Sequence, residues 1–167
     1  TTYTIITGED SLLVTKAEVE DLLAHFDTSL STYISKSIVT KFNRAPVGIN
    51  IYNDKYMFFQ RCLEESIEIY KVTEGAFNPS VYPLVAGWGF LKDPKIEMDE
   101  MKVDSLLKLT GFEEGIDFSY SRMSNGQFSL VKKKNNLRFD FNAIAQGLSV
   151  DEVAKLMESK GHKNYFV

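Results

Sequence analysis

Apolar residues recur every three or four positions near the start of the chain, and this spacing predicts an amphipathic helix. Its buried face would be formed by Val19, Leu22, Leu23, Phe26 and Leu30. Thr15 and Glu18 form a capping-box pattern just before this face. The helix is therefore expected to begin at this pattern and to end near Thr28.

The same helical spacing returns after Asn53 and Asp54, where a second helix is expected to begin. Its buried stripe would be formed by Phe59, Cys62, Leu63, Ile69 and Tyr70. Gly75 suits the C-cap of this helix, because glycine adopts the left-handed backbone conformation at little cost. The residues after it, Ala76 to Asn78, are therefore expected on a loop.

Alternation of apolar and polar residues predicts strands in three further places. Tyr3 and Ile5 indicate an opening strand, residues 137–141 a later one, and residues 165–167 a last one. Asn125-Gly126 is a strong signal for the turn of a hairpin. If strands 137–141 and 165–167 pair in parallel, the helix between them should make a right-handed crossover.

Two more helices complete the predicted α+β unit, in which we find no internal repeat or linker. A short helix should run from about Glu100 to Thr110 and end at Gly111. A longer helix should run from about Ala143 to Ser159. Its inward-facing residues would be Val150, Val153, Ala154 and Met157.

Polar residues gather where strand 137–141 meets the following helix. Asp140 and Asn142 lie at the junction, and the first helical turn leaves backbone N–H groups free. These groups and the helix dipole favour a bound anion, and the neighbouring acid suggests a metal or a ribose hydroxyl as a second ligand. From these residues alone, an ordinary turn with Asp140 or Asn142 as the N-cap is the favoured interpretation.

The composition is that of a packed globular protein. Of the 167 residues, 44% are hydrophobic and 13% aromatic, which is enough for a sizeable core. The net charge of −4 argues against a nucleic-acid-binding surface. The run Lys132-Lys133-Lys134 is the one basic cluster in the sequence, and its position between two predicted strands indicates a solvated turn.

The sequence contains one cysteine, two isolated histidines and no membrane-spanning run. Cys62 lies at an apolar helix position and is expected to be buried packing. His25 is predicted on the polar side of its helix and His162 in a turn, so neither contributes to a visible metal cluster. No apolar run is long enough to span a bilayer.

Four motifs occur in order along the chain. The first is Leu30-Ser31-Thr32-Tyr33, followed by Ser37 and Asn43, and the second is Gly75-Ala76-Phe77-Asn78-Pro79-Ser80-Val81. The third is Trp88-Gly89-Phe90, and the fourth comprises Asp140, Ala145-Gln146-Gly147 and Val150-Asp151, with the turn and strand from residue 161 to residue 167 after it. Together these motifs resemble the ApbE family, the flavin transferases that move FMN from FAD onto a protein.

The resemblance implies an ApbE-like (T-fold-like) mixed sheet with packed helices. It covers residues 1–167 as the N-terminal portion of the family's domain, because family members continue with a Gly-Gly turn, a His-containing region and a late Asp/Thr metal loop. The chain is therefore expected to be a partial domain that is inactive by itself. Two positions depart from the pattern: Gln146 stands where many members have Lys, and Asn78 stands where many have Asp.

The resemblance also implies a set of binding residues. Tyr33 would pack on the isoalloxazine ring of FAD, and Ala76, Phe77 and Asn78 would hold its adenosine end. The side chains of Asp140 and Gln146 would contact FAD, and the backbone carbonyl of Ala143 would be one ligand of Mg²⁺. Trp88-Gly89-Phe90 is expected to pack beneath the site, and no catalytic acid or base is identified. Without the family, a half-exposed core role for Tyr33 and a plain turn for residues 76–78 remain open.

The implied activity is that of an FAD:protein FMN transferase. It transfers FMN from FAD to a Thr hydroxyl of an acceptor flavoprotein, such as a redox-complex subunit, with Mg²⁺ as cofactor and AMP as the product. Hydrolysis of FAD to FMN and AMP and a non-catalytic flavin-binding module are the alternatives. The resemblance further implies the bacterial periplasm or cell envelope, and a possible lipid anchor encoded upstream of Thr1.

Overall fold

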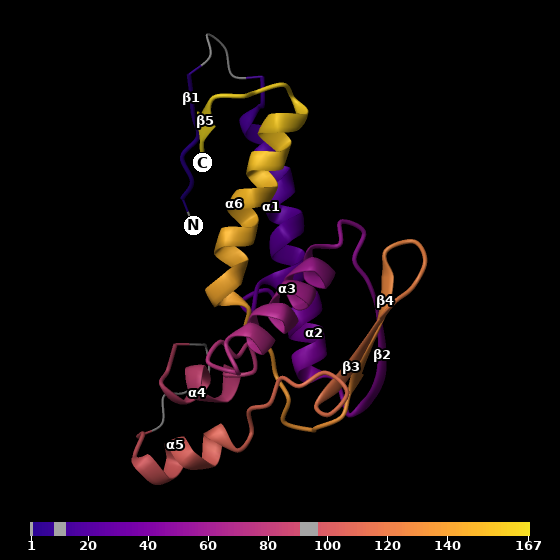
Figure 1. The fold of residues 1–167 in the computed structure, drawn as a ribbon, viewed down its shortest axis with the longest axis vertical. Coiled ribbons are helices and arrows are strands. Elements are labelled where there is room, and N and C mark those ends of the chain that lie inside the picture. Colours follow the sequence, from indigo (N-terminus) through magenta and orange to yellow (C-terminus); the bar gives the residue numbers. More distant parts are fainter. Residues whose placement is uncertain (1, 9–12, 91–96) are drawn as a thin grey trace.

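The computed structural model describes residues 2–8, 13–90 and 97–167 and confirms the α+β class. The helices are α1 (Lys16–Leu30), α2 (Ile38–Arg44), α3 (Phe58–Val72), α4 (Tyr82–Gly87), α5 (Glu100–Leu107) and α6 (Asn142–Ser159). The strands are β1 (Ile6–Thr7), β2 (Gly48–Asn53), β3 (Phe118–Arg122), β4 (Gln127–Lys132) and β5 (Tyr165–Phe166). Figure 1 shows an elongated molecule in which α1 and α6 extend away from a broader part that holds the larger sheet.

The broader part, which we call the body, is built around an antiparallel sheet in the order β2-β4-β3. One face of this sheet is covered by α3: Phe59 of the helix stacks on Phe128 of β4, with ring centroids 5.2 Å apart. At the edge of this contact the Tyr120 hydroxyl donates hydrogen bonds to Gln60 and Glu64 on α3. The buried stripe predicted for this helix is present at Phe59, Cys62 and Leu63, but Ile69 is 37% exposed, so its assignment to the stripe is wrong, and Tyr70 is only partly buried.

The hairpin predicted at Asn125-Gly126 is confirmed. Both residues have positive φ, 58° and 73°, as the turn between two twisted antiparallel strands requires. The turn also docks on the start of α3, because the Gly126 carbonyl accepts a hydrogen bond from the Asp54 N–H at 2.8 Å. A Cβ at Gly126 would lie 3.0 Å from the Asp54 carbonyl oxygen, so this position also needs glycine for space.

The prediction of a solvated lysine turn at residues 132–134 is wrong for Lys132. This residue ends β4 on the inner face of the sheet and is 1% exposed. Its ammonium donates to the carbonyls of Phe42, Asn43 and Ala45, at the C-terminal end of α2. Burial lowers the pKa of Lys132 to about 8. The charge is retained there because the unpaired carbonyls of a helix end attract cations.

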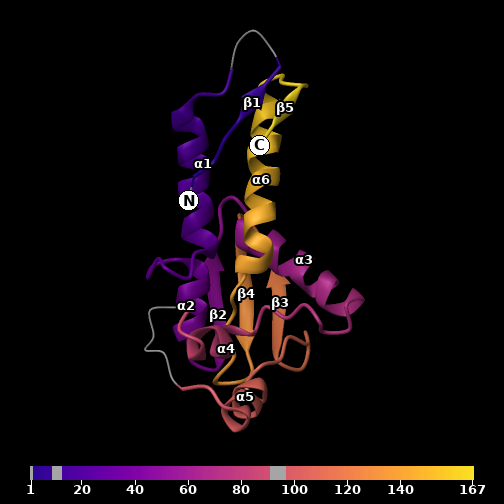
Figure 2. The same cartoon turned by 90° about the vertical axis from the view of Figure 1, so that its left-hand side faces the viewer.

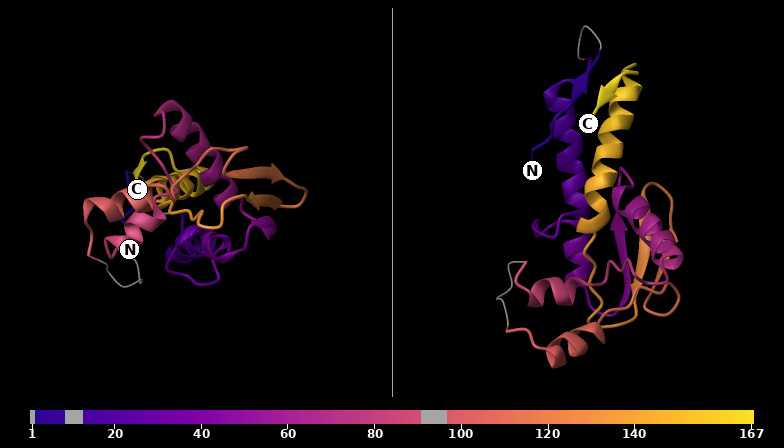
Figure 3. Two further views of the ribbon diagram at one scale, coloured as in Figure 1. Left: turned by 90° about the horizontal axis from the view of Figure 1, so that it is seen from below. Right: turned by 60° about the vertical axis from the view of Figure 1, so that its left-hand side comes forward.

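The second part of the molecule, which we call the arm, consists of α1 and α6 side by side, with β1 and β5 alongside the helix ends that are remote from the body (Figures 1 and 2). Its small core contains Val14, Val19, Val153 and Met157. Figure 3 shows the two helices in contact along the arm from a third direction. Val150, which was expected to face inward, is 39% exposed, so that part of the prediction is wrong.

Strand pairing in the arm differs from the predicted crossover. β5 pairs with β1 in antiparallel register, Ile6 opposite Phe166, and not with residues 137–141. The parallel βαβ unit therefore does not form. The cause is that residues 137–141 form their backbone hydrogen bonds with side chains and loops instead of with a strand, as described below.

The predicted capping residues are present at the ends of α1 and α3, but the last residue of α1 differs from the predicted one. The capping box at Thr15 and Glu18 is present, and α1 continues to Leu30 instead of ending near Thr28. After α3 the Gly75 N–H binds the Tyr70 carbonyl and the Glu74 N–H binds the Lys71 carbonyl. This is a Schellman cap, in which both Glu74 and Gly75 have positive φ.

Candidate functional site

Residues 137–141 belong to no strand, contrary to the sequence-based expectation, and Phe141 is the N-cap of α6. Leu137, Phe139 and Phe141 are all fully buried, so the predicted apolar face is correct. The Asn43 side chain takes the place of a neighbouring strand: its Oδ1 accepts from the Phe139 N–H at 2.7 Å, and its Nδ2 donates to the Phe139 carbonyl at 2.8 Å. We call this pair of hydrogen bonds the Asn43 clamp.

The clamp is reinforced from both sides. Phe42, the residue before Asn43, stacks on Phe139 with ring centroids 4.6 Å apart. The carbonyl of Asn43 itself is held by the buried ammonium of Lys132. Because Asn43, Lys132 and Phe139 are all buried, these polar contacts are shielded from water and fix the backbone that leads into Asp140.

The next peptide connects two of the predicted motifs. The Asp140 N–H donates to the Pro79 carbonyl at 2.7 Å, which places the loop after α3 against the start of α6. On that loop Asn78 Oδ1 accepts from the Ser80 N–H and hydroxyl, at 2.9 and 2.8 Å. The Ser80 hydroxyl oxygen in turn accepts from the Gly111 N–H at 2.7 Å. Asn78 and Asp140 are thus held in adjacent tight turns.

Asn78 has one polar side-chain group left for a ligand. Since its Oδ1 faces two donors of Ser80, the remaining group is the Nδ2 amide, which can only donate a hydrogen bond. An Asp in the same turn would present a second carboxylate oxygen, which can only accept. Asn78 therefore presents a hydrogen-bond donor where an Asp would present an acceptor.

Asp140 lies at the N-terminal end of α6. Its Oδ1 accepts from the Asn142 N–H at 2.9 Å, which satisfies a free N–H of the first helical turn. Burial raises the pKa of the Asp140 carboxyl above its ordinary value, and the Asn142 hydrogen bond offsets part of this effect. A bound cation near the carboxylate would favour its charged form.

The first two turns of α6 present Ala143, Gln146 and Gly147 on the exposed surface. A Cβ built on Gly147 meets no atom within 4 Å, so packing does not require glycine there. Glycine inside a helix costs about 0.5–1 kcal/mol relative to alanine. Packing within the chain does not explain Gly147. A ligand that approaches the helix backbone closely beside Ala143 and Gln146 would explain it, because glycine has no side chain in the way.

Tyr33 is also exposed, at 55%, and its hydroxyl lies 3.5 Å from the Phe90 carbonyl. Trp88 and Phe90 are 49% and 73% exposed, so the expectation that they pack beneath the site is wrong in this chain. Three aromatic side chains therefore lie on the surface at the end of α4. Among the described residues, no hydrogen bond joins Tyr33 to Asp140 or Gln146.

Ala76 is exposed, and Phe77 is partly buried. The Phe77 N–H donates to the Thr73 hydroxyl at 3.1 Å, which fixes the loop to the end of α3. The structure thus brings residues 76–78, Asp140, Ala143 and Gln146 into one neighbourhood through the Pro79–Asp140 hydrogen bond. Among the described residues, no group of three or more His, Cys, Asp or Glu side chains could hold a metal ion.

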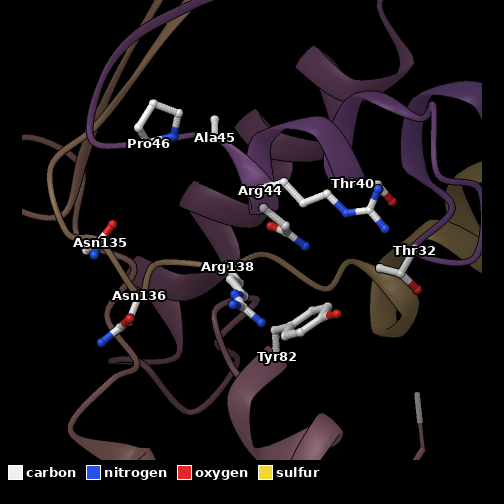
Figure 4. Close-up of a pocket in the computed structure, with 10 residues that line it drawn as sticks. Thr32, Thr40, Arg44, Ala45, Pro46, Tyr82, Asn135, Asn136 and Arg138 are labelled. Atoms are coloured by element: carbon white, nitrogen blue, oxygen red, sulfur yellow. The ribbon is translucent and has the colours of Figure 1, made fainter. Parts of the chain in front are cut away.

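A cavity of about 570 Å³ adjoins this neighbourhood (Figure 4). Residues 135–138, the C-terminal end of α2 and the start of α4 surround it. The side chains that line it include Thr32, Arg44, Tyr82, Asn135, Asn136 and Arg138. Of these, only Thr32 belongs to a motif recognised in the sequence, and Arg138 lies two residues before the motif residue Asp140. Alternation with the buried Leu137 and Phe139 would have identified Arg138.

Known proteins resemble this chain over nearly its whole length. The model of the ApbE family matches residues 1–167. "FAD:protein FMN transferase" from Haemophilus influenzae is 30% identical over 153 residues, which are 92% of this chain and 43% of the relative. The protein of the same name from Vibrio cholerae is 29% identical, over 91% of this chain and 43% of its own length. The chain therefore spans less than half the length of these relatives.

Solved structures give the same result. A mutant of Flavin Transferase ApbE from Vibrio cholerae superposes with a TM-score of 0.79 at 26% identity, covering 96% of this chain and 54% of that one. The apo form of the Pseudomonas stutzeri flavinyl transferase ApbE gives 0.72 at 29% identity, covering 89% and 45%. With a family model matched from end to end and a fold shared with these structures, the chain belongs to the ApbE family.

Proposed function

We propose that the protein containing this chain is an FAD:protein FMN transferase, with the chain supplying FAD-binding loops. The observation that carries the proposal is the Pro79–Asp140 hydrogen bond, which joins two motifs of the ApbE family beside the exposed first turns of α6. The names of the relatives support flavin transfer as the reaction.

In the proposed reaction the hydroxyl oxygen of an acceptor Thr attacks the phosphorus of the FMN half of FAD. A new P–O bond forms to the Thr oxygen, the bond from this phosphorus to the bridging oxygen breaks, and AMP leaves with that oxygen. The hydroxyl proton passes to a base that we do not assign to this chain. Positioning and charge compensation supply most of the catalysis in phosphoryl transfer.

The described residues would divide the binding between them. Tyr33, 55% exposed, would stack on the isoalloxazine ring, and residues 76–78 would hold the adenosine end. Asp140 and Gln146 would contact FAD from either side of the first turn of α6. With Gln146 in place of the commoner Lys, this contact is a neutral hydrogen bond.

Mg²⁺ would be held in part by this chain. The donor types fit a hard cation, because Ala143 offers a carbonyl oxygen and Asp140 a carboxylate whose pKa burial has raised. They do not complete an octahedral shell, and no acidic cluster among the described residues adds the missing donors. When bound, Mg²⁺ would offset the negative charge of the pyrophosphate.

We further propose that the protein works in the bacterial periplasm or cell envelope, held there by a lipid anchor, and that its acceptor is a subunit of a redox complex. These proposals rest on family resemblance. No helix within residues 2–8, 13–90 and 97–167 is long and apolar enough to cross a membrane.

The test is incubation of the gene product that contains this chain with FAD, Mg²⁺ and a Thr-containing acceptor protein. Covalent flavin on the acceptor, seen as fluorescence in a denaturing gel together with AMP release, is the expected result. Free FMN without labelled acceptor would show FAD hydrolysis, and unchanged FAD would show a binding module. Either of these outcomes would contradict the proposal.

Tyr33→Ala tests the assignment of the flavin end. The variant should weaken binding of FAD more than binding of AMP, because the lost surface faces the isoalloxazine ring; aromatic contacts of this kind contribute about 0.5–1.5 kcal/mol. Isothermal titration with both ligands measures the difference. Equal losses for FAD and AMP would remove Tyr33 from the flavin site.

A further inference from the structure

The cavity at the C-terminal end of α2 has an unusual charge for this chain. The protein as a whole carries a net charge of −4, yet two of the side chains that line the cavity are arginines and none is a carboxylate. Arg44 and Arg138 form no ion pair with any acid among the described residues. Figure 4 shows Arg44 on the α2 side of the cavity and Arg138 on the opposite side, beside Tyr82.

The position of Arg138 is fixed by its neighbours. Because Leu137 and Phe139 are fully buried and successive side chains of an extended segment point to opposite sides, Arg138 must point away from the core. Its guanidinium lies over the Tyr82 ring, 5.5 Å from the centroid. This contact supports one face of the guanidinium and leaves its N–H edge free for a planar or tetrahedral oxyanion.

Arg44 is not needed at the end of its own helix. The carbonyls at the C-terminus of α2 already accept from the ammonium of Lys132. A third cation therefore lies just beneath the cavity wall, and all three raise the positive potential at the same place. Without an anion this arrangement is repulsive, and Arg138 lowers the pKa of Lys132 through that repulsion.

Hydrogen-bond donors also gather at the cavity. The Thr32 hydroxyl is buried without a hydrogen-bond partner among the described residues, and Asn135 and Asn136 add side-chain amides. The Asn43 amide is excluded from this count, because the Phe139 backbone already uses it. Two guanidinium forks and a hydroxyl offer more N–H and O–H groups than the two oxygens of a carboxylate can accept.

We propose that this cavity binds a phosphate-class anion, either free inorganic phosphate or the phosphate group of a nucleotide, through Arg44, Arg138 and the Thr32 hydroxyl. The site is distinct in its residues from those predicted to contact flavin. Its volume of about 570 Å³ lies within the range of small-molecule sites and leaves room for more than the phosphate itself.

The experiment is isothermal titration of the gene product with sodium phosphate, with AMP and with sodium acetate at low ionic strength. Saturable binding of phosphate or AMP is expected, and Arg138→Gln and Arg44→Gln should each weaken it at least tenfold. Arg122→Gln is the matched control, because Arg122 is equally charged but pairs with Glu64 of α3, at the opposite end of β3 from the strand position that pairs with Lys132. It should leave the affinity unchanged.

Tighter binding of AMP than of phosphate, lost in both cavity variants, would support a nucleotide phosphate as the ligand, and equal affinities would support free phosphate. AMP binding that both variants retain would belong to the adenosine end of the proposed FAD site, and without phosphate binding it would overturn the proposal. The proposal is overturned if neither anion binds saturably, if acetate binds as well as phosphate, or if the control weakens binding as much as the cavity variants. Since both arginines lie at the surface of the cavity, thermal unfolding should show all variants folded. The readout needs no FAD and no acceptor, so its failure leaves the flavin-transfer proposal intact.

Discussion

The body and the arm of this molecule are stabilised in different ways. The body has a core dominated by phenylalanines that contact one another ring to ring, with Phe139 touching Phe42, Phe112, Phe118 and Phe141. Among the described residues, the core of the arm contains three buried valines and a buried methionine and no fully buried aromatic ring. At the end of the arm, Lys160 and Glu18 form an ion pair, and His162 Nε2 accepts from the Leu13 N–H at 2.9 Å.

This difference explains where the candidate site lies. Asp140 and the first turns of α6 lie on the aromatic side, where the Asn43 clamp and the Pro79 carbonyl hold the backbone in water-free surroundings. Rigid surroundings of this kind suit a site that must hold a ligand in one orientation. The far end of α6 belongs to the arm, where a small core with Val153 and Met157 and polar contacts such as the Lys160–Glu18 ion pair hold the helix.

The largest expected effect is a loss of folding stability when a core side chain is truncated, and it allows the core of the body to be compared with that of the arm. Phe139→Ala should lower the free energy of unfolding by about 3–5 kcal/mol, since it removes a ring that contacts four others. Met157→Ala in the arm should cost less, nearer the lower end of the range of about 2–5 kcal/mol for such truncations. Urea unfolding of both variants provides the comparison. Equal costs would show that the arm is as tightly packed as the body.

The second prediction removes the Asn43 clamp. Asn43→Ala leaves the Phe139 N–H and carbonyl buried without partners, at about 1–3 kcal/mol for each group. FAD binding should fall as well, because Asp140 follows Phe139 directly. Asn50→Ala is the control, since the Asn50 amide donates only to Gly48 on the edge strand β2. A clamp variant with normal stability and normal FAD affinity would show that the clamp positions nothing.

The third prediction concerns the buried carboxylate. Burial raises the pKa of Asp140, so its charge opposes folding, and the stability that protonation provides is lost as pH rises through the folded-state pKa. Asp140→Asn keeps the acceptor for Asn142 without the charge. It should raise the unfolding midpoint at pH 7 and raise it less at pH 4, while weakening FAD and Mg²⁺ binding. A midpoint lowered at pH 7 would contradict this account.

The fourth prediction concerns Gly147. Because a methyl group there meets no atom within 4 Å, Gly147→Ala should stabilise α6 by up to about 1 kcal/mol. If a ligand lies against the helix at this position, the same methyl group should weaken FAD binding. Thermal unfolding and FAD titration on one preparation measure both effects. Unchanged FAD affinity would place the flavin away from this helix face.

The smallest effect is expected in the arm. Lys160 and the hydrogen bonds from Thr15 hold the pKa of Glu18 at about 2, below its ordinary 4.5. The ionised Glu18 carboxylate therefore contributes to folding stability above pH 4.5, and this contribution is lost as the pH falls toward 2. Amide-exchange protection in the first turn of α1 should fall over this range, while protection in β4 stays constant. In Glu18→Gln the first turn should lose this pH dependence.

Local sequence signals predicted those parts of the fold that depend on nearby residues. The capping box at Thr15, the Asn125-Gly126 turn and the stripe on α3 each depend on residues within one or two turns, and each is present. α2 and β2 were not predicted. α2 is only seven residues long, and five of them are buried, so the helix is too short for a clear helical period. β2 exposes Ile49 and Ile51 to solvent, the reverse of the usual pattern.

The candidate site could be predicted only as a set of motifs. The family pattern named residues 76–78, Asp140, Ala143 and Gln146, but the contacts that bring these segments together are not local. Asn43 and Phe139 are 96 positions apart, and a side chain that replaces a strand leaves no periodic signal. Lys132 looked like a surface residue because two lysines follow it, and only the carbonyls of a distant helix end make its burial possible.

Chemical modification of one residue in the aromatic core would report transient opening of the body. Cys62 is the single cysteine in the sequence, it is fully buried beneath the sheet, and burial raises the pKa of its thiol. A thiol-specific reagent can therefore modify Cys62 only in molecules whose body has opened. The rate of modification would measure how often the body opens, without any added label. A ligand that binds and stabilises the closed body would slow the reaction in proportion to its occupancy.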